Sequence, residues 1–262
     1  MGWKIIVFSV LFSGLFSNTS KGQSPYELHW KKEAILIGGG MGMLGIGRSL
    51  HNRMQALTED RVFRMDRSLV NRFDLAATYY YYRSSDKISD YLFFSTYALP
   101  LTLLAPRKTR SHFPSLALLY GETLLLSKGI VVLTNRIIKR PRPFVFNEQA
   151  NLSEKTKRAA RYSFISDHTA TVAASCFFLA STFRDFYPDS KLRPYIWATA
   201  ITLPTATAIF RITAGEHYPT DTIVAFFIGS SIGLLIPRWH KKRHSSLTIL
   251  PSTNQVALHY QF

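Results

Sequence analysis

The sequence predicts an all-α protein, a six-helix bundle embedded in a membrane. Two observations carry this prediction: apolar runs recur along the chain, and aromatic residues lie near the ends of several runs. The runs are 34–47, 91–105, 115–133, 169–183, 194–210 and 222–237. The last five contain 15 to 19 residues each, at or just under the length of a membrane-spanning helix. A soluble all-helical protein with uniformly apolar core helices is the alternative, and a mean hydropathy of +0.02 leaves it open.

Residues 1–22 have the pattern of a bacterial export signal. Lys4 supplies the positive charge, Ile5–Phe16 is a 12-residue apolar stretch, and Ser20-Lys21-Gly22 is a small-x-small cleavage site. An uncleaved first membrane helix is the alternative, but the apolar stretch is short for one. We therefore expect a signal peptide that is removed.

Residues 23–90 form an N-terminal region of two parts. The first, 34–47, is rich in glycine, which we interpret as small residues that let helices approach closely, because no nucleotide-binding pattern accompanies them. The second predicts an amphipathic helix, with apolar residues at helical spacing: Val62, Met65, Leu69 and Phe73. Nucleic-acid binding by its arginines is disfavoured by the interleaved Asp60, Asp66 and Asp74. The remainder divides into a helical core, 91–240, and a C-terminal tail, 241–262, expected as a small hairpin or extended segment.

The formal net charge of +16 indicates an anionic partner, either a membrane surface or a phosphorylated substrate. A hydrophobic content of 47% argues against a basic disordered tail or a small nucleic-acid-binding module, so no nucleic-acid partner is expected. The only cysteine, Cys176, lies in an apolar run and allows neither an intramolecular disulfide nor a zinc-type cysteine cluster. Its expected role is that of a small buried hydrophobic residue.

Basic clusters orient the predicted bundle. The linker 106–112 and the segment 238–244 are rich in Lys and Arg, and the positive-inside rule places both on the cytoplasmic side. The opposite ends of the helices then face outward. If the segment 34–47 also spans the membrane after a cleaved signal, this orientation reverses.

Three polar stretches lie at helix ends that are predicted to face the same side. Arg211–Asp221 reads R-I-T-A-G-E-H-Y-P-T-D, Asn135–Pro143 reads N-R-I-I-K-R-P-R-P, and Ser163–Thr169 reads S-F-I-S-D-H-T. In the first stretch an aspartate four residues after a histidine shares its face if both lie on a helical turn, and can then orient the imidazole. Arginines supply planar cations that fit phosphate oxygens, and a helix start supplies backbone N–H groups.

The three stretches together resemble the type-2 phosphatidic-acid phosphatase superfamily, whose signature is K-x6-R-P, then P-S-G-H, then S-R-x5-H-x3-D. The third motif matches at Arg211, His217 and Asp221, with Phe210 at the serine position. The first matches at Arg142 and Pro143, but Asn135 stands at the lysine position. The second matches at Ser166 and His168, with Ile165 replacing proline and Asp167 replacing glycine.

The resemblance implies a catalytic set of His217, His168 and Asp221. His217 is expected to attack phosphorus and form a phosphohistidine, Asp221 to orient it, and His168 to protonate the leaving group. The implied phosphate-binding residues are Arg142, Arg211, Ser166, Asp167, Asn135 and Lys139, with Arg136 and Arg140 nearby. No metal and no cofactor is implied. Asn135 removes a cation from the family pattern, for which Arg136 or Lys139 can partly compensate. Asp167 brings a carboxylate that repels phosphate, unless it points away, pairs with a neighbouring arginine or alters the choice of substrate.

The expected function is that of a membrane-bound lipid phosphatase acting on a lipid-linked phosphate monoester or pyrophosphate in the bacterial cell envelope, with its active site facing the periplasm. Two alternatives remain: a secreted soluble acid phosphatase or haloperoxidase-like enzyme, and a catalytically degenerate membrane protein that keeps the fold.

Overall fold

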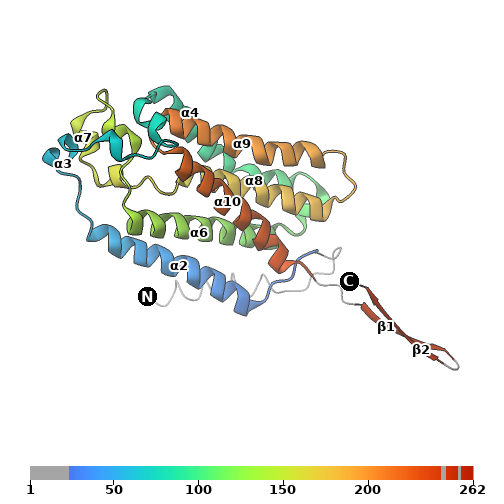
Figure 1. The fold of residues 1–262 in the computed structure, drawn as a ribbon. Helices are drawn as coiled ribbons and strands as arrows, with labels where there is room; N and C mark the ends of the chain where they lie inside the picture. The colour runs from blue at the N-terminus through green and yellow to red at the C-terminus, as the bar shows by residue number, and fades with distance from the viewer. Residues whose placement is uncertain (1–23, 243–245, 253–254, 262) are drawn as a thin grey trace, which may run out of the picture.

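The computed structural model describes residues 24–242, 246–252 and 255–261. The predicted signal peptide, 1–22, lies outside these residues. Six helices of 14 residues or more are packed side by side in a bundle, which confirms the all-α fold (Figure 1). They are α2 (Trp30–Asn52), α4 (Arg83–Thr96), α6 (Phe113–Ile138), α8 (Asp167–Phe186), α9 (Arg193–Thr213) and α10 (Pro219–His240).

Short helices connect the long ones, and a two-stranded antiparallel hairpin follows α10. The connecting elements are α3 (Glu59–Phe63), η1 (Arg67–Leu69), η2 (Leu75–Tyr79), η3 (Leu99–Leu104), α5 (Arg107–Arg110), η4 (Pro143–Phe146), α7 (Leu152–Lys155) and η5 (Arg158–Arg161). The hairpin pairs β1 (Ser246–Ser252) with β2 (Gln255–Gln261), one of the two forms expected of the tail.

Two helix predictions were wrong in detail. The expected amphipathic helix through Val62 and Phe73 is broken, because Asp66 adopts an extended conformation and its side chain accepts hydrogen bonds from Ser68 instead of continuing the helix. The apolar run 91–105 is not one helix either. The helix α4 begins at Arg83 and ends at Thr96, and Pro100 lies in the 3-10 helix η3 that follows.

The helix α8 lies at the centre of the bundle and contacts α4, α6, α9 and α10. Glycines bring α10 unusually close to it. A Cβ atom added at Gly229 would lie 2.2 Å from the carbonyl oxygen of Ala170, and one added at Gly233 would lie 2.5 Å from that of Ala174. No real Cβ atom tolerates such distances, so this helix pair depends on glycine. The close packing fixes the first half of α8 against the middle of α10.

Glycines of α2 also allow close helix packing, in this case between α2 and α6. Added Cβ atoms at Gly40 and Gly47 would lie 2.6 Å from side-chain atoms of Leu125 and Val132 of α6. Gly42, by contrast, has no neighbour within 4 Å. The interpretation of this glycine-rich segment as a helix-packing surface is therefore confirmed for those glycines that face α6.

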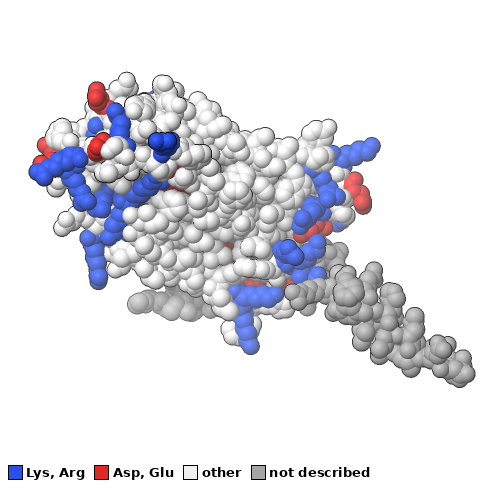
Figure 2. Space-filling model, viewed as in Figure 1, with Lys and Arg blue, Asp and Glu red and all other residues white. Residues whose placement is uncertain are grey.

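The surface of the bundle has the charge pattern of a membrane protein. Two stretches are long and apolar enough to cross a membrane, Phe113–Phe146, which contains α6, and Pro219–His240, which is α10. On the face shown in Figure 2, Lys, Arg, Asp and Glu gather at the two ends and leave an uncharged band between them. Large apolar side chains are exposed along the helices, among them Ile35, Met41, Ile209, Ile223 and Phe227. Such a belt fits a lipid environment.

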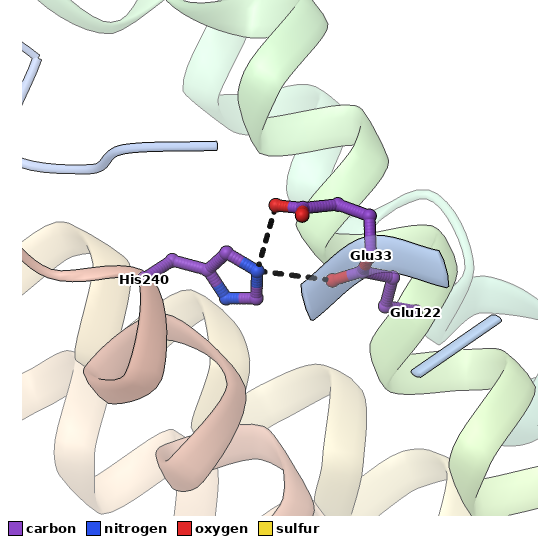
Figure 3. Close-up of side chains that lie close together, drawn as sticks. All are labelled: Glu33, Glu122 and His240. Carbon is purple, nitrogen blue, oxygen red and sulfur yellow. Dashed lines mark ion pairs between the residues drawn. The ribbon is translucent and has the colours of Figure 1, made fainter. Parts of the chain in front are cut away.

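Three ionisable side chains are buried where α2, α6 and α10 meet, near the C-terminal end of α10 (Figure 3). They are Glu33, Glu122 and His240, with exposures of 0%, 1% and 1%. Their end of α10 is opposite to the end that carries His217 and Asp221. Because α10 has 22 residues, the two groups lie about 30 Å apart along its axis.

Candidate functional site

The three polar stretches meet at the end of the bundle where α6 and α9 finish and α8 and α10 begin (Figure 1). Local sequence explains the turn that carries the central histidine. Gly215 has φ +71°, and a Cβ atom there would lie 2.4 Å from the carbonyl oxygen of Tyr80. Only glycine fits this position. The turn lets the backbone N–H groups of Glu216 and His217 donate hydrogen bonds to the carbonyl oxygen of Arg211. These bonds close the C-terminal end of α9, whose last residue is Thr213.

His217 is fixed in one orientation by the main chain. Its Nδ1 lies 2.7 Å from the carbonyl oxygen of Ser163, and its side chain is 2% exposed. A carbonyl only accepts hydrogen bonds, so Nδ1 carries the proton and the neutral ring keeps a free lone pair on Nε2. Asp221 Oδ2 lies 3.9 Å from Nδ1, too far for a hydrogen bond. His217 precedes α10 rather than sharing its first turn, which is why Ser163, and not Asp221, makes the direct contact.

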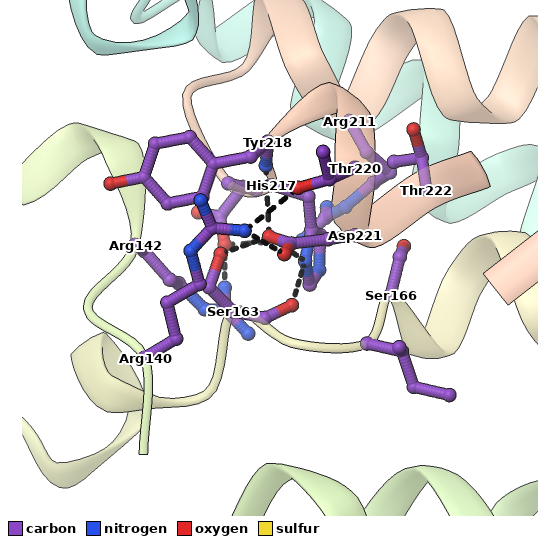
Figure 4. A network of polar contacts seen from close by, with 12 residues as sticks. Arg140, Arg142, Ser163, Ser166, Arg211, His217, Tyr218, Thr220, Asp221 and Thr222 are labelled. Carbon is purple, nitrogen blue, oxygen red and sulfur yellow. Dashed lines mark hydrogen bonds and ion pairs between the residues drawn. The ribbon is translucent and has the colours of Figure 1, made fainter. Parts of the chain in front are cut away.

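Asp221 supports the site through its neighbours (Figure 4). It is the third residue of α10, and its Oδ2 accepts hydrogen bonds from the backbone N–H of Tyr218 at 2.9 Å and from Ser163 Oγ at 2.5 Å. Its Oδ1 accepts from Arg140 Nη1 at 2.6 Å. Asp221 therefore holds the residue whose carbonyl group orients His217, and its effect on the imidazole is indirect.

Arg140 connects this network to the N-terminal region. Its guanidinium donates to Asp221 and, at 2.7 Å, to Asp74 Oδ2, and it lies 3.8 Å from the ring centre of Tyr218. Asp74 is fully buried and also accepts from the backbone N–H and the hydroxyl of Thr220. A single arginine thus pairs with two buried carboxylates, and hydrogen bonds from Thr220, Ser163 and the backbone N–H of Tyr218 satisfy their oxygens further.

Arg142 and Arg211, the two expected phosphate clamps, converge on one carboxylate. Glu216 Oε2 accepts from Arg211 Nη2 at 3.1 Å and is also paired with Arg142 Nη1. Arg211 Nη1 donates to Asp86 Oδ1 at 2.6 Å. The geometry brings two planar guanidinium cations to one point, an arrangement that suits a phosphate group. The carboxylate of Glu216 lies at that point.

His168 lies beside this pair of arginines. Its Nε2 is 2.8 Å from Asp90 Oδ1, and the same carboxylate oxygen is 4.0 Å from Arg211 Nη1. The ring of Phe93 packs against the imidazole with a centroid distance of 4.4 Å. Asp90 therefore links His168 to Arg211, and Glu216 links Arg211 to Arg142. One continuous chain of polar contacts joins these five side chains.

Burial and neighbouring cations lower the pKa of His217 from its usual 6.5 to about 4. Removal from water is the larger cause, and the positive charges of Arg142 and Arg211 act in the same direction. The side-chain contact with Asp221 opposes them. His217 is consequently neutral over the physiological range of pH, in the form that carries a nucleophilic lone pair.

The remaining expected phosphate-binding residues have other contacts. Ser166 caps α8, with its Oγ accepting from the backbone N–H of Thr169 at 3.4 Å. Asn135 donates to the carbonyl oxygens of Val131 and Ile165 at 3.0 and 3.1 Å, and so ties α6 to the loop before α8. Lys139 is the C-cap residue of α6, with φ 54° and an exposed side chain.

Asp167 is paired with a lysine. Its Oδ2 contacts Lys128 Nζ of α6. Lys128 precedes Asn135 by seven residues, or two helical turns, so both side chains share one face of α6. The partner is a lysine rather than one of the nearby arginines.

Several residues of this network were missed in the sequence. Ser163 and Glu216 lie inside the polar stretches, but nothing in their spacing shows that a carbonyl group or a carboxylate would face the site. Asp74, Asp86 and Asp90 come from a distant segment whose charges predict only a solvated face. Asp74 is buried, whereas Asp86 and Asp90 are partly exposed, and the contacts of all three depend on tertiary packing, which residue spacing does not show.

The helical core is similar to known proteins in two comparisons. The family model described as PAP2 superfamily matches residues 116–245, which include α6, α8, α9 and α10. A solved structure described as the first transmembrane PAP2 type phosphatidylglycerolphosphate phosphatase from Bacillus subtilis aligns with 17% identity and a TM-score of 0.43, over 90% of this chain and 92% of that one. None of the curated proteins matched. On the family match, which contains all three polar stretches, the chain belongs to the PAP2 superfamily.

Proposed function

We propose that this protein is a membrane-bound phosphatase that hydrolyses a lipid-linked phosphate monoester or pyrophosphate through a phosphohistidine on His217. The observation that carries the proposal is the state of this side chain. The carbonyl group of Ser163 holds its Nδ1 proton, which leaves Nε2 unprotonated in a site shared with two converging arginines. A neutral, oriented imidazole beside paired guanidinium groups suits nucleophilic attack on phosphorus.

Arg142 and Arg211 would bind the non-bridging oxygens of the phosphoryl group and stabilise charge in the transition state. Both already point to a single anionic group, Glu216. Substrate binding then requires the Glu216 carboxylate to leave the position between them. The reaction thus begins with an exchange of one anion for another, and the site never exposes two unpaired cations.

His168 would act as general acid and then as general base. In the first step it protonates the oxygen of the leaving alcohol or phosphate while the His217–phosphorus bond forms. In the second step it removes a proton from water, which attacks phosphorus and releases inorganic phosphate. Asp90, 2.8 Å from His168 Nε2, holds that ring in place.

The substrate class follows from the position of the site. The polar network lies at one end of a bundle whose sides are apolar, so an amphiphile can place its phosphate in the site and its chains beside the helices. Phosphatidic acid, phosphatidylglycerol phosphate, isoprenyl pyrophosphate and a phosphorylated glycolipid all have this form. The basic segments 106–112 and 238–242 belong to the opposite end, and by the positive-inside rule this supports a site that faces the periplasmic side of a bacterial membrane.

The test is phosphate release from a panel of these lipids by purified protein in detergent. Wild-type protein is expected to release phosphate and to form an acid-labile, base-stable phosphoenzyme from a 32P-labelled substrate. His217→Ala should abolish both signals, and His168→Ala should slow turnover. His29→Ala, which changes an exposed histidine at the far end, is the control. Equal activity of wild type and His217→Ala would reject the nucleophile.

The alternative, a catalytically degenerate membrane protein, predicts a different outcome of the phosphate-release assay. Asn135→Lys combined with Asp167→Gly restores the family residues at both altered positions. If wild-type protein releases no phosphate from any lipid and the double variant does, the chain is a catalytically silent member of its family, and the proposal fails.

A further inference from the structure

Three helices place a histidine and two glutamates around one buried point (Figure 3). His240 Nε2 lies 3.2 Å from Glu33 Oε1 and 3.6 Å from Glu122 Oε2, and one ligand atom from each residue lies within 4.8 Å of the others. We propose that Glu33, Glu122 and His240 bind a divalent transition-metal ion, Zn²⁺ in the first place, that joins α2 to α6 and α10.

The orientation of the His240 ring suits a metal ligand. Its Nδ1 lies 2.8 Å from the carbonyl oxygen of Ile236, so Nδ1 carries the proton and the Nε2 lone pair faces the two glutamates. A hydrogen bond from the second ring nitrogen to a main-chain carbonyl is the usual support of a metal-binding histidine. Glu33 is also supported, because its Oε1 accepts from the backbone N–H of His29 at 3.0 Å.

The cluster is incomplete without a cation. Glu33 Oε2, both carboxylate oxygens of Glu122 and Nε2 of His240 are buried and have no hydrogen-bond partner within the described part of the chain. Buried carboxylates of this kind are costly unless they are paired or coordinate a metal. Two carboxylates and a neutral imidazole carry two negative charges, which one divalent ion neutralises.

The spacing also fits a metal. With metal–ligand bonds of about 2.05 Å, the ligand atoms of a tetrahedral Zn²⁺ site are about 3.3 Å apart. The two distances from His240 Nε2, 3.2 and 3.6 Å, lie on either side of that value, so the side chains need little rearrangement. An imidazole with two carboxylates suits Zn²⁺, Mn²⁺ or Fe²⁺ better than Ca²⁺ or Mg²⁺, which prefer all-oxygen sites.

A pocket borders the cluster at His240. It has a volume of about 850 Å³, and His240 belongs to its lining together with His29, Leu36 and Lys32. Because Nε2 of His240 is itself buried, an ion enters the cluster from this pocket only when the side chains around it move, and three protein ligands leave a coordination position for water. Basic residues at the rim, including Lys241 and Lys242, will slow the exchange of cations, so removal of the metal requires prolonged chelation.

The test uses untagged full-length protein in detergent, stripped with a chelator, dialysed against Zn²⁺ and analysed by elemental mass spectrometry. We expect about one equivalent of bound Zn²⁺, a Tm that rises on loading, and a tetrahedral absorption spectrum when Co²⁺ replaces Zn²⁺. Glu122→Gln and His240→Gln should each raise the Kd at least about 100-fold and abolish the Tm response. Glu27→Gln is the matched control, because Glu27 forms an exposed pair with His29 at the same end of the bundle.

Two results would overturn the proposal. One is wild-type protein that binds none of Zn²⁺, Mn²⁺, Fe²⁺ and Co²⁺ and shows no Tm response, which would assign the cluster to proton sharing. The other is Glu122→Gln that retains one equivalent of metal at wild-type affinity. The wild-type titration needs no variant, so the outcome does not depend on how well the substituted proteins fold.

Discussion

Glu216→Gln tests whether the carboxylate between the arginines competes with phosphate. Glutamine keeps the shape of the side chain and an oxygen that accepts from Arg211, but it removes the charge. Glu216 Oε2 lies 3.1 Å from Arg211 Nη2 and also contacts Arg142, and all three side chains are largely buried, with exposures of 11%, 4% and 20%. The substitution therefore changes the anion that phosphate has to replace and leaves the arginines in position.

The magnitude follows from the type of hydrogen bond. A bond to a charged acceptor contributes about 1.5 to 3 kcal/mol, and one between neutral partners about 0.5 to 1.5 kcal/mol. Replacing the carboxylate by an amide removes the charge of the acceptor and leaves that of the arginines. It weakens the internal competitor by about 1.3 kcal/mol, the difference between the middles of these ranges, which is close to tenfold in an equilibrium constant. Glu216→Gln should bind inorganic phosphate about tenfold more tightly. It should also have a lower Tm without phosphate, because Arg142 loses its counter-charge and Arg211 keeps only Asp86 and Asp90.

The assay is competitive inhibition of phosphate release by inorganic phosphate or orthovanadate, at fixed ionic strength. The matched control is Glu154→Gln, which removes a carboxylate paired with Arg83 and Tyr81 and should leave the inhibition constant unchanged. A Glu216→Gln inhibition constant that is unchanged or higher than that of wild type would refute the reasoning. It would show that Glu216 holds the arginines in place for phosphate instead of competing with it.

Three further predictions concern stability and pH. Gly233→Ala should lower the free energy of unfolding by about 1 to 3 kcal/mol, because the added Cβ atom meets the main chain of α8. Gly42→Ala, whose Cβ atom faces open space, should leave it unchanged. Equal Tm values for the two variants would contradict the packing argument. Since the pKa of His217 is about 4, the acid limb of kcat/KM should lie near pH 4 and not near 6.5. The same shift lowers stability as pH falls from 6.5 to 4, because only the unfolded chain takes up the proton in that window; a denaturant series over this range, compared with a His217→Gln variant, checks the sign. Arg140→Ala leaves Asp74 and Asp221 buried without their cation, and a loss of about 3 to 5 kcal/mol is expected in thermal or denaturant unfolding; a loss below 1 kcal/mol would show that the network is solvated.

The sequence predicts the fold and the meeting of the three polar stretches, because both depend on local pattern. Each apolar run except 91–105 marks a helix, and the polar stretches occur where helices begin or end, so Arg142, Arg211 and His217 could be expected to lie at the same end of the bundle. The contacts of those residues were less predictable. The spacing of His217 and Asp221 indicates a direct pair only if both lie on one helical turn, and the glycine turn at Gly215 places the histidine before the helix instead.

Contacts with distant segments could not be predicted at all. Asp74 directly follows the predicted amphipathic helix and Asp86 lies further along the same N-terminal region, yet their carboxylates pair with Arg140 and Arg211. The buried cluster of Glu33 and His240 joins the N-terminal region to the end of the helical core, about 200 residues further along the chain. Charge patterns in sequence are local, whereas the pairing of buried charges is decided by which helices pack together.

The two altered motif positions, Asn135 and Asp167, can be explained by one ion pair. In the family pattern a lysine at position 135 adds a positive charge to the phosphate site, and the glycine at position 167 adds none. Here the lysine on that face of α6 stands two turns earlier, at Lys128, and its ammonium group is paired with the Asp167 carboxylate. Neither change therefore leaves an isolated charge, because the cation and the anion neutralise one another. Under the proposed function, the site would depend on Arg142 and Arg211 for its cations, and Glu216, which is paired with both, would control access to them. A site with two cations and an internal competitor favours a substrate that brings additional binding energy from elsewhere, and the apolar sides of the bundle offer that energy to a lipid chain.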